Sequence, residues 1–191
     1  MTISGAPGTG NTTVSRIVAE RLRYRLVTMG EMNKEIARDA GYTMEGFWKK
    51  LEKDPDELAR FHKALDQRQK DIASKETDVI FNGKLSAFQI PQARVRVLIR
   101  ASLKTRAERT VKRDGGDVQE AERSIKSREE SERKDWKKVY GFDYTADTEA
   151  YNLILDTDNM TAEQAADKVI EMIRREEHDG KRKSMRGNKR K

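Results

Sequence analysis

Residues 1–13 read MTISGAPGTGNTT, and this stretch decides the fold. A short apolar strand at 2–4 runs into a glycine-rich turn at 5–10, and a helical pattern follows. The turn matches the phosphate-loop motif G-x-x-x-x-G-K-[ST], except that Asn11 stands at the lysine position. Its glycines let successive backbone N–H groups point inward at an anion, and the helix start adds a partial positive charge. We therefore predict that residues 5–13 bind a triphosphate.

One hydroxyl in this loop is a candidate metal ligand. Thr12 occupies the position that binds Mg²⁺ in loops of this type. The alternative interpretation is a plain surface turn, which the position of the loop directly between strand and helix disfavours. The predicted triphosphate-binding residues are Gly5, Ala6, Pro7, Gly8, Thr9, Gly10, Asn11, Thr12 and Thr13.

Length and composition fit one enzyme-sized domain. A chain of 191 residues is long enough to bury a core without disulfides. The absence of cysteine excludes a disulfide-built fold and a cysteine nucleophile. Because Met1 leads straight into the first strand, we expect no signal peptide, and no apolar run is long enough to span a membrane. We expect a cytoplasmic protein with no membrane partner.

The positive charge of the chain is concentrated at its end. The net charge is +7, and residues 181–191 carry seven basic and no acidic residues. The rest of the chain is therefore neutral. We expect a disordered basic tail that contacts RNA or another polyanion, with a solvated terminus as the alternative.

Further apolar runs indicate four more strands. They lie at 26–29, 79–81, 95–99 and 153–155, and helical patterns separate them. Five strands alternating with helices predict an α/β, doubly wound domain. Because active sites in such sheets lie at the carboxyl ends of the strands, the loop, Gly30, 82–84 and 156–157 should surround one cleft.

Two segments lie outside this alternation. Residues 30–75 contain three helical patterns in a row and predict a subdomain on the rim of the sheet. A long helix is predicted from Asp117 to about residue 140, and its stretch 128–135 contains no apolar residue. A helix that buries so little is a poor core element and a good mobile lid.

Several short motifs together carry a family resemblance. The chain resembles the archaeal-type cytidylate kinases, which belong to the nucleoside monophosphate (NMP) kinases among the P-loop NTPases. The resemblance covers roughly residues 1–175. Its segments are T-I-S-G-A-P-G-T-G at the start, G-E-M at 30–32, L-D-Q-R-Q at 65–69, N-G-K-L at 82–85, R-A-E-R-T-V-K-R at 106–113, S-R-E-E-S-E at 127–132, Y-G-F-D at 140–143 and L-D-T at 155–157.

The resemblance implies a fold with three working parts. These are a five-stranded parallel sheet in a three-layer α/β/α domain over residues 1–178, a helical NMP-binding insert at about 30–75, and a mobile lid at about 114–140. The basic tail, 179–191, lies outside the resemblance. A monomer suits this architecture.

The implied reaction is transfer of the ATP γ-phosphoryl group to CMP or dCMP, with Mg²⁺. Such a reaction needs little covalent help from the protein, but it needs two charged phosphates held in line and the developing charge neutralised. The acceptor is already an anion, so no general base is required. Dense cationic side chains should therefore converge on the cleft.

The resemblance also assigns residues. The lid cation Arg128 and the phosphate-gripping Lys84 are implied catalytic residues, with Arg133 as a further lid candidate. Arg109 and Arg113 match ATP-contacting positions, although either could simply pair with the neighbouring Glu108 or Asp114. The implied NMP-binding residues are Gly30, Lys34, Asp66, Arg68, Gly83 and Lys84. Lys34, Asp66 and Arg68 could instead be ordinary residues of solvated helix faces.

Some positions depart from the family pattern. Asn11 replaces the loop lysine, Asn82 replaces an acid associated with the Mg²⁺ shell, and Lys84 replaces an arginine that could grip phosphate bidentately. Asp135 stands where a second lid arginine is expected, which is why Arg133 is considered. Two hypotheses stay open at this stage: a CMP kinase with altered phosphate contacts, and a nucleotide-binding protein of the same fold with little or no transferase activity, associated with RNA through its tail.

Overall fold

A single parallel sheet forms the centre of the molecule. The computed structural model describes residues 1–141 and 147–187, with 179–187 as backbone only. The strand order is β2-β3-β1-β4-β5, and every neighbouring pair is parallel, which confirms the predicted fold class. The strands are β1 (Thr2–Gly5), β2 (Arg25–Thr28), β3 (Val79–Asn82), β4 (Arg96–Arg100) and β5 (Leu153–Asp156).

Side-chain caps fix where most of the helices begin. Thr28, Thr43, Asp54, Ser102 and Asp117 each accept a hydrogen bond from a backbone N–H of the first turn, which satisfies donors that the helix itself leaves unpaired. The described helices are α1 (Asn11–Leu22), α2 (Met29–Asp39), α3 (Met44–Leu51), α4 (Pro55–Lys75), α5 (Ser86–Gln89), α6 (Leu103–Asp114), α7 (Val118–Tyr140) and α8 (Ala162–Gly187).

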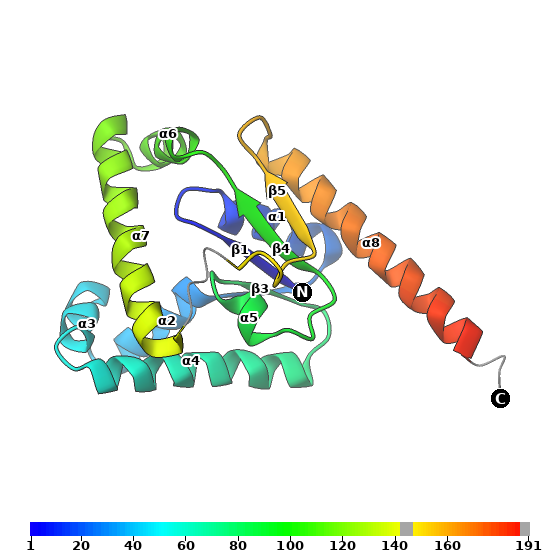
Figure 1. Ribbon diagram of the computed structural model, residues 1–191, viewed down its shortest axis with the longest axis horizontal. Coiled ribbons are helices and arrows are strands. Elements are labelled where there is room, and N and C mark those ends of the chain that lie inside the picture. The colour runs from blue at the N-terminus through cyan, green and yellow to red at the C-terminus, as the bar shows by residue number, and fades with distance from the viewer. Residues whose placement is uncertain (142–146, 188–191) are drawn as a thin grey trace.

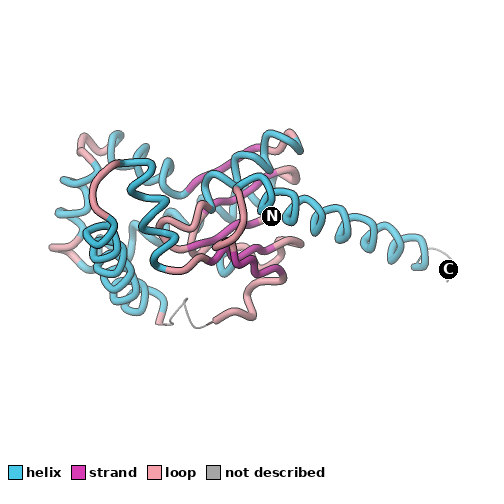
Figure 2. Tube along the Cα trace, turned by 90° about the horizontal axis from the view of Figure 1, so that it is seen from above, coloured by secondary structure: helices cyan, strands magenta, loops and turns pink. Residues whose placement is uncertain are grey.

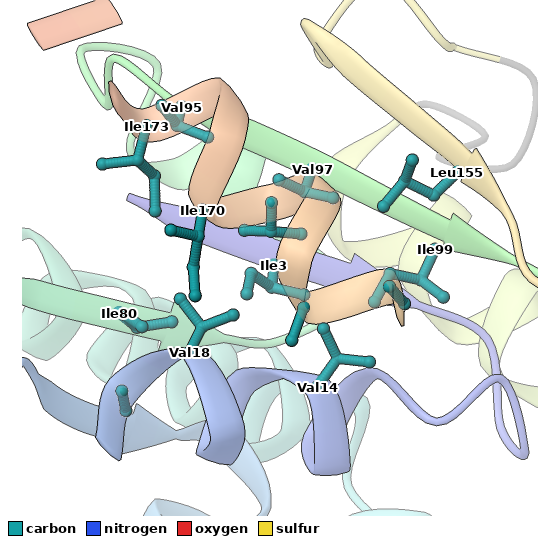
Figure 3. Close-up of a cluster of buried hydrophobic side chains, with 14 residues drawn as sticks. Ile3, Val14, Val18, Ile80, Val95, Val97, Ile99, Leu155, Ile170 and Ile173 are labelled. Carbon is teal, nitrogen blue, oxygen red and sulfur yellow. The ribbon is translucent and has the colours of Figure 1, made fainter. Parts of the chain in front are cut away.

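Helices cover both faces of the sheet. On one face α1 and α8 pack together over β1 and β4, and Figure 3 shows side chains such as Val18, Ile3 and Ile170 meeting there. On the other face a second core joins β2 and β3 to α2 and α4 through residues that include Phe81 and Leu65. The result is three layers, as expected for parallel strands whose two faces are both buried.

The carboxyl ends of the strands meet at one edge. Gly5 at the end of β1 pairs with Ile99 of β4, and Thr28 at the end of β2 pairs with Asn82 at the end of β3. The Ser4 hydroxyl donates to the Gly83 carbonyl at 2.8 Å, so the segments that follow β1 and β3 are fastened together. This edge is where ligands bind in open α/β sheets.

The insert and the lid lie beside each other on the rim. Helices α2, α3 and α4 share a small core of Ala37, Phe47, Leu51 and Phe61. Helix α7 packs on α6 at one end and runs down to α4 at the other (Figure 1). The polar helix predicted as a lid therefore bridges the two sides of the sheet edge.

Two sequence predictions need correction. Two strands are shifted by one residue: the predicted strands at 26–29 and 95–99 begin at Arg25 and Arg96, and Met29 opens α2 because Thr28 caps it. The tail was predicted to be disordered, but α8 continues to Gly187 and extends away from the body (Figure 2). Its docked first half nucleates the helix, and lysine, arginine and methionine propagate helices well.

The remaining tail residues, 188–191, lie outside the described part of the chain, as do residues 142–146, where part of the Y-G-F-D segment falls. Contact of the tail with a polyanion stays a prediction. Among the described residues, no helix is long and apolar enough to cross a bilayer.

Candidate active site

The glycine-rich loop between β1 and α1 has the geometry expected of an anion-binding turn. Gly8 and Gly10 have φ values of 81° and 87°, a left-handed conformation that favours glycine. The Thr9 backbone N–H and its hydroxyl both bond to the Ala6 carbonyl, at 3.2 and 2.9 Å, which closes the turn. Helix α1 then begins at Asn11 without a side-chain cap or an acidic residue in its first turn. No side chain caps the backbone N–H groups of the first turn of α1. An anion site requires such N–H groups to be available to the ligand.

Helix α6 packs against this loop so closely that Gly8 is needed for steric reasons as well. A Cβ on Gly8 would lie 2.8 Å from the Arg106 carbonyl oxygen. The Arg106 guanidinium donates to the Pro7 carbonyl at 3.3 Å, and that of Arg109 donates to the Thr9 carbonyl at 3.0 Å. Two adjacent turns of α6 therefore fasten the loop and bring two cations to it.

The three arginines of α6 have different surroundings. Arg109 also bonds to the Thr157 hydroxyl at 3.1 Å, so it joins the phosphate loop to the segment after β5. Arg113 is exposed and pairs with its neighbour Asp114 at 2.6 Å, which is the ordinary surface role considered above. Arg106 was not among the predicted site residues, yet its side chain is only 10% exposed. It lies three residues before Arg109 and hence on the same helix face, which is a signal that could have found it.

Thr12 and Asn82 bring two oxygen atoms together next to the loop. Thr12 Oγ1 and Asn82 Oδ1 are 3.5 Å apart. Asn82 Nδ2 donates to Ser15 Oγ at 2.7 Å, which leaves Oδ1 facing Thr12. Hydroxyl and amide oxygens are hard donors that suit Mg²⁺, which also draws ligands from substrate phosphates and water. The pair therefore fits a metal-phosphate site, although its own charge is zero and the described residues contain no cluster of three acidic or histidine ligands.

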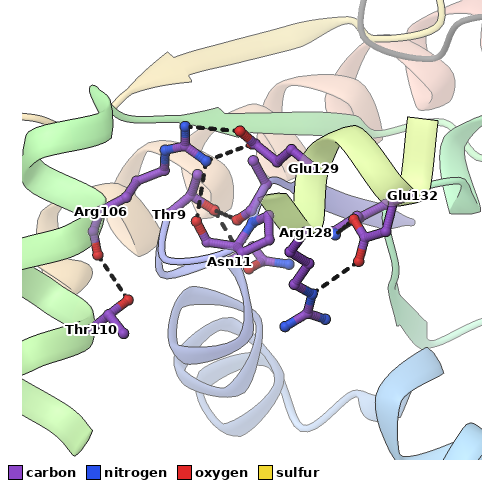
Figure 4. A network of polar contacts seen from close by, with 10 residues as sticks. Thr9, Asn11, Arg106, Thr110, Arg128, Glu129 and Glu132 are labelled. Carbon is purple, nitrogen blue, oxygen red and sulfur yellow. Dashed lines mark hydrogen bonds and ion pairs between the residues drawn. The ribbon is translucent and has the colours of Figure 1, made fainter. Parts of the chain in front are cut away.

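Two carboxylates of the lid helix form ion pairs with the cations at this edge of the sheet. Glu129 pairs with Arg106 at 2.6 Å, and Glu132 pairs with Arg128 at 3.0 Å (Figure 4). Glu132 also pairs with Lys84. Lys84 is 15% exposed and Glu132 21%, so this ion pair is largely removed from water. Burial lowers the pKa of Lys84, while the carboxylate of Glu132 opposes that shift. Two of the predicted catalytic cations thus meet at one anion.

The predicted residues of the insert divide into buried and exposed groups. Asp66 is 7% exposed on α4. Gly83 is held tightly: a Cβ there would lie 2.6 Å from Ser86 Oγ. Lys34 is exposed on α2, and Arg68 is exposed and pairs with Glu35 at 3.4 Å.

The remaining predictions fall on exposed parts of α2 and α7. Gly30 lies in the first turn of α2, and Arg133 is an exposed residue of α7 next to Glu132. Neighbours on a helix point about 100° apart, so Arg133 lies on a different face from Glu132.

Asp66 takes part in a buried hydrogen-bond chain. The Tyr140 hydroxyl, at the end of α7, donates to Asp66 Oδ2. Gln69 Nε2 donates to Asp66 Oδ1 at 3.4 Å, and Ser86 Oγ donates to Gln69 Oε1 at 2.8 Å. Burial raises the pKa of Asp66, although the Tyr140 hydroxyl and Lys70 oppose the shift. Burial raises the pKa of Tyr140 as well, and the carboxylate of Asp66 raises it further.

A buried histidine lies beside this chain. His62 packs against the Tyr140 ring, with ring centres 6.1 Å apart, and against Phe61 and Trp48. Burial lowers its pKa to about 4. His62 is therefore neutral at physiological pH and serves as packing between α4 and the end of the lid.

Sheet order and loop geometry define the class of protein. A parallel sheet of order 2-3-1-4-5 with a glycine-rich phosphate loop after its central strand is a P-loop α/β fold. Solved structures agree on this fold: shikimate kinase from Acinetobacter baumannii in complex with shikimate superposes with a TM-score of 0.56, at 18% identity over 90% of this chain and 91% of that chain.

Within this class the family is clear. The model of the cytidylate kinase-like family matches residues 1–159, and the chain belongs to that family. A relative named cytidylate kinase from Methanopyrus kandleri is 38% identical over 174 residues, covering 86% of this chain and 87% of the relative. One from Archaeoglobus fulgidus is 34% identical over 91% of this chain and 93% of the relative. The resemblance seen in the short motifs is thereby confirmed.

Proposed function

We propose that this protein transfers the γ-phosphoryl group of ATP to the α-phosphate of CMP or dCMP, giving ADP and CDP or dCDP. The observation that carries the proposal is the match to relatives named cytidylate kinase over most of both chains. In the reaction an α-phosphate oxygen of the acceptor forms a bond to the γ-phosphorus while the bond to the β,γ-bridging oxygen breaks. The protein therefore acts in pyrimidine nucleotide metabolism.

The donor side of this reaction is assigned to residues 5–13. Their backbone N–H groups bind the triphosphate, and the glycines allow the close approach. Asn11 leaves the usual lysine charge missing from the loop. Arg106 is the candidate to supply it, because its buried guanidinium lies at the loop and its Nε has no hydrogen-bond partner within the described residues. Arg109 holds the loop in position through the Thr9 carbonyl.

Thr12 and Asn82 are the residues that would hold Mg²⁺. Bound there together with ATP, Mg²⁺ would supply positive charge that offsets the negative charge developing during transfer. Because Thr12 and Asn82 carry no charge, they support a metal that arrives bound to the nucleotide rather than one that the protein holds alone. Ser15 keeps the oxygen of Asn82 turned toward Thr12.

The acceptor side is assigned to the segment after β3 and to the insert. Lys84 is a buried cation at the sheet edge and would hold the α-phosphate of the acceptor. Arg128 on the lid pairs with Glu132, the same carboxylate that pairs with Lys84, and would neutralise charge during transfer. This division supports a core domain with an insert at about 30–75 and a lid at about 114–140.

A coupled assay tests this function. The purified protein is supplied with ATP, Mg²⁺ and one of CMP, dCMP, UMP or AMP, and ADP release is followed together with the phosphorylated product. We expect stoichiometric ADP and CDP, and loss of turnover when EDTA removes the metal. Absence of ADP release with all four acceptors would overturn the proposal.

A further inference from the structure

Helix α8 consists of two halves with opposite charge. Residues 162–173 contain three acidic residues and one lysine, and their apolar side chains from Ala165 to Ile173 pack in the core with α1 and the sheet. Residues 174–187 contain six basic and three acidic residues, and all three acidic ones precede residue 180. The first half of α8 is therefore a docked, acidic helix, and the second half is basic.

The acidic residues of the docked half have partners within the protein. Arg21 of α1 pairs with Glu163 and, at 2.7 Å, with Asp167. Arg175 pairs with Glu171 at 2.5 Å. These pairs fasten α8 to the body and neutralise its first half, so that the unbalanced positive charge of the helix lies beyond them.

The basic half leaves the body at the edge of the sheet opposite the phosphate loop. Helix α8 follows the last strand and runs back along the sheet, as helices do between parallel strands. The hydroxyl of Tyr24, the residue just before β2, donates to Glu177 at 3.3 Å, so α8 has reached the amino ends of the strands there. From this point it extends away from the body (Figure 1 and Figure 2). A ligand bound to it would leave the candidate active site open.

Helical spacing gathers basic residues on one side of this projecting half. The positions at i, i+4, i+7, i+8 and i+12, which share one face of a helix, are Arg174, His178, Lys181, Arg182 and Arg186. We call this set the basic stripe. Its first two members are exposed. The helix rises about 20 Å over residues 174–187, so the basic stripe presents its charge along a line rather than at a point.

Composition narrows the class of partner. Met185 is the only large apolar residue between 174 and 191, and this stretch has no Phe, Trp or Tyr. A membrane-bound amphipathic helix needs an apolar face, and protein interfaces are centred on apolar and aromatic residues. Lysine and arginine alone are sufficient to bind the phosphate backbone of a nucleic acid. The basic stripe therefore fits a nucleic acid better than a membrane or a protein.

The same composition distinguishes between single strands and duplexes. Proteins that hold single strands combine positive charge with aromatic side chains on which the bases stack, and such side chains are missing from this stretch. A duplex carries one charge per about 1.7 Å of its axis, about twice the density of a single strand. A line of cations without aromatic residues is therefore suited to a duplex.

We propose that the basic stripe binds the phosphate backbone of double-stranded nucleic acid without reading its sequence. RNA and DNA duplexes share this chemistry, and the experiment distinguishes them. The family model matches residues 1–159, so the basic stripe lies outside the part of the chain that the model covers. The inference goes beyond the proposed function, because it concerns where the protein is held and not what it catalyses.

Fluorescence anisotropy of labelled RNA and DNA duplexes of equal length measures this binding with the full chain. We expect the unaltered protein to bind a duplex, with an affinity that falls steeply as salt rises from about 50 to 200 mM. The stripe variant replaces four cations by glutamine, which keeps a high helix propensity: Arg174, Lys181, Arg182 and Arg186. It should bind about 100-fold more weakly at low salt, and the slope of log K against log salt should become shallower by about 3.5.

A matched control removes the same number of charges elsewhere. It carries glutamine in place of three arginines and one lysine that are exposed on the body: Arg16, Arg60, Lys75 and Arg94. Because both variants lose four positive charges, a general effect of net charge would weaken them equally. We expect the control to stay within about twofold of the unaltered protein. Equal weakening of the two variants would overturn the assignment to the basic stripe.

A proline variant tests the helical arrangement. Ser184→Pro keeps every charge but interrupts the helix, because proline lacks a backbone N–H and clashes with the preceding turn. We expect duplex affinity to fall about tenfold, since Arg186 no longer lies in line with the rest of the basic stripe. Unchanged affinity would mean that a flexible charged segment is sufficient, and would contradict the role of the helix.

Nucleotide turnover shows whether the duplex binds away from the candidate active site. With a saturating duplex, kcat/KM for CMP should change by less than about twofold, because the basic stripe leaves the opposite edge of the sheet. Competition of the duplex with ATP or CMP would place it at the cations of the active site and overturn the proposal. The anisotropy measurements need no turnover, so they remain decisive even if the proposed function fails.

Vesicles of phosphatidylcholine and phosphatidylserine test a membrane as the partner. We expect the protein to cosediment with them no better than the stripe variant does, because the helix offers no apolar face. Stripe-dependent binding to these vesicles without binding to either duplex would overturn the proposal in favour of a membrane. Failure to bind both duplexes at about 50 mM salt would overturn it as well.

Discussion

The donor and acceptor halves of this site are built in different ways. The donor half is one continuous loop, residues 5–10, whose shape comes from its own glycines and from a turn between Thr9 and Ala6. The acceptor half is assembled from side chains far apart in sequence: Lys84 meets Glu132, and Asp66 meets Tyr140. Local backbone geometry positions the first, and packing of the lid against the insert positions the second.

This difference indicates which half is rigid and which half responds to ligand. Loop atoms fixed by backbone turns and by α6 have little freedom to rearrange. Helix α7 contacts the acceptor half through the side chains of Glu132 and Tyr140, which a ligand can replace. Ile125 is the single buried residue along this helix. We expect substitutions in the donor half to act through geometry and those in the acceptor half through charge and selectivity.

The largest effect is expected from Gly8→Val. A side chain at this position clashes with the Arg106 carbonyl and is strained at a φ of 81°, so the loop must move away from α6. Misplacing several phosphate-binding amides should lower kcat/KM for ATP by about three orders of magnitude. Gly41→Val is the control, because Gly41 has a similar φ of 77° but open space around it and lies outside the site. Equal losses in the two variants would mean that backbone strain alone lowers activity, and would contradict a specific role of the contact between Gly8 and α6.

Lys84→Met should be the most damaging change in the acceptor half. It removes the buried cation and leaves Glu132 paired, among the described residues, with the exposed Arg128. We expect a loss of about 100- to 1,000-fold in turnover with CMP, and an unchanged affinity for ATP in equilibrium binding. Lys49→Met, which breaks an exposed pair with Glu45, is the control and should be neutral. A matched loss of ATP affinity in Lys84→Met would contradict the separation into two halves.

The acceptor half should also make the stability of the protein sensitive to acid, because the buried His62 packs against Tyr140 there. Because burial lowers the pKa of His62 to about 4 from an ordinary value of 6.5, the unfolded chain binds a proton between these pH values that the folded chain does not. Stability should therefore fall as pH drops from about 6.5 to about 4, by about 3 kcal/mol in total.

The pH effect can be isolated by substitution. In His62→Phe the free energy of unfolding, measured in urea at a series of pH values, should lose this part of its pH dependence. His178→Gln, which changes the exposed second histidine on α8, is the control and should keep it. Parallel pH dependence in His62→Phe and the unaltered protein would show that His62 is not responsible.

A smaller effect separates two arginines of the same helix. Arg109 joins the Thr9 carbonyl to Thr157, whereas Arg113 pairs with Asp114 at the surface. We expect Arg109→Gln to raise the KM for ATP about tenfold and Arg113→Gln to change it less than twofold. The KM for ATP in both variants at saturating CMP provides the measurement. A larger effect at Arg113 would restore its predicted contact with ATP.

The two halves also differ in how far sequence could predict them. The phosphate loop was predictable because residues 1–13 contain the glycines and the Thr9–Ala6 turn that give it its shape, although its contacts with α6 were not. The apolar runs located all five strands within one residue. The sequence points to Thr12 and Asn82 separately. Only the structure shows that their side-chain oxygens, from residues 70 positions apart in the chain, lie next to each other. Periodicity could have suggested Arg106, because it shares a helix face with Arg109.

Other features could not be predicted from local patterns. Nothing near Asp66 in sequence indicates that Tyr140, 74 residues away, bonds to it, and the polar stretch of the lid hides which of its charges face inward. Arg113 and Lys34 have the right residue type but face solvent or a neighbour, because their position depends on how α6 and α2 are packed. The final turns of α8 were missed because composition alone favoured disorder.

The most direct test is a crystal structure with the bisubstrate analogue in which cytidine and adenosine are joined by five phosphates. The account predicts phosphates on the amides of residues 5–13 and a phosphate oxygen on Lys84, with Glu132 displaced from Lys84. The account would be contradicted if the analogue bound with the Lys84–Glu132 pair intact and with its phosphates away from residues 5–13.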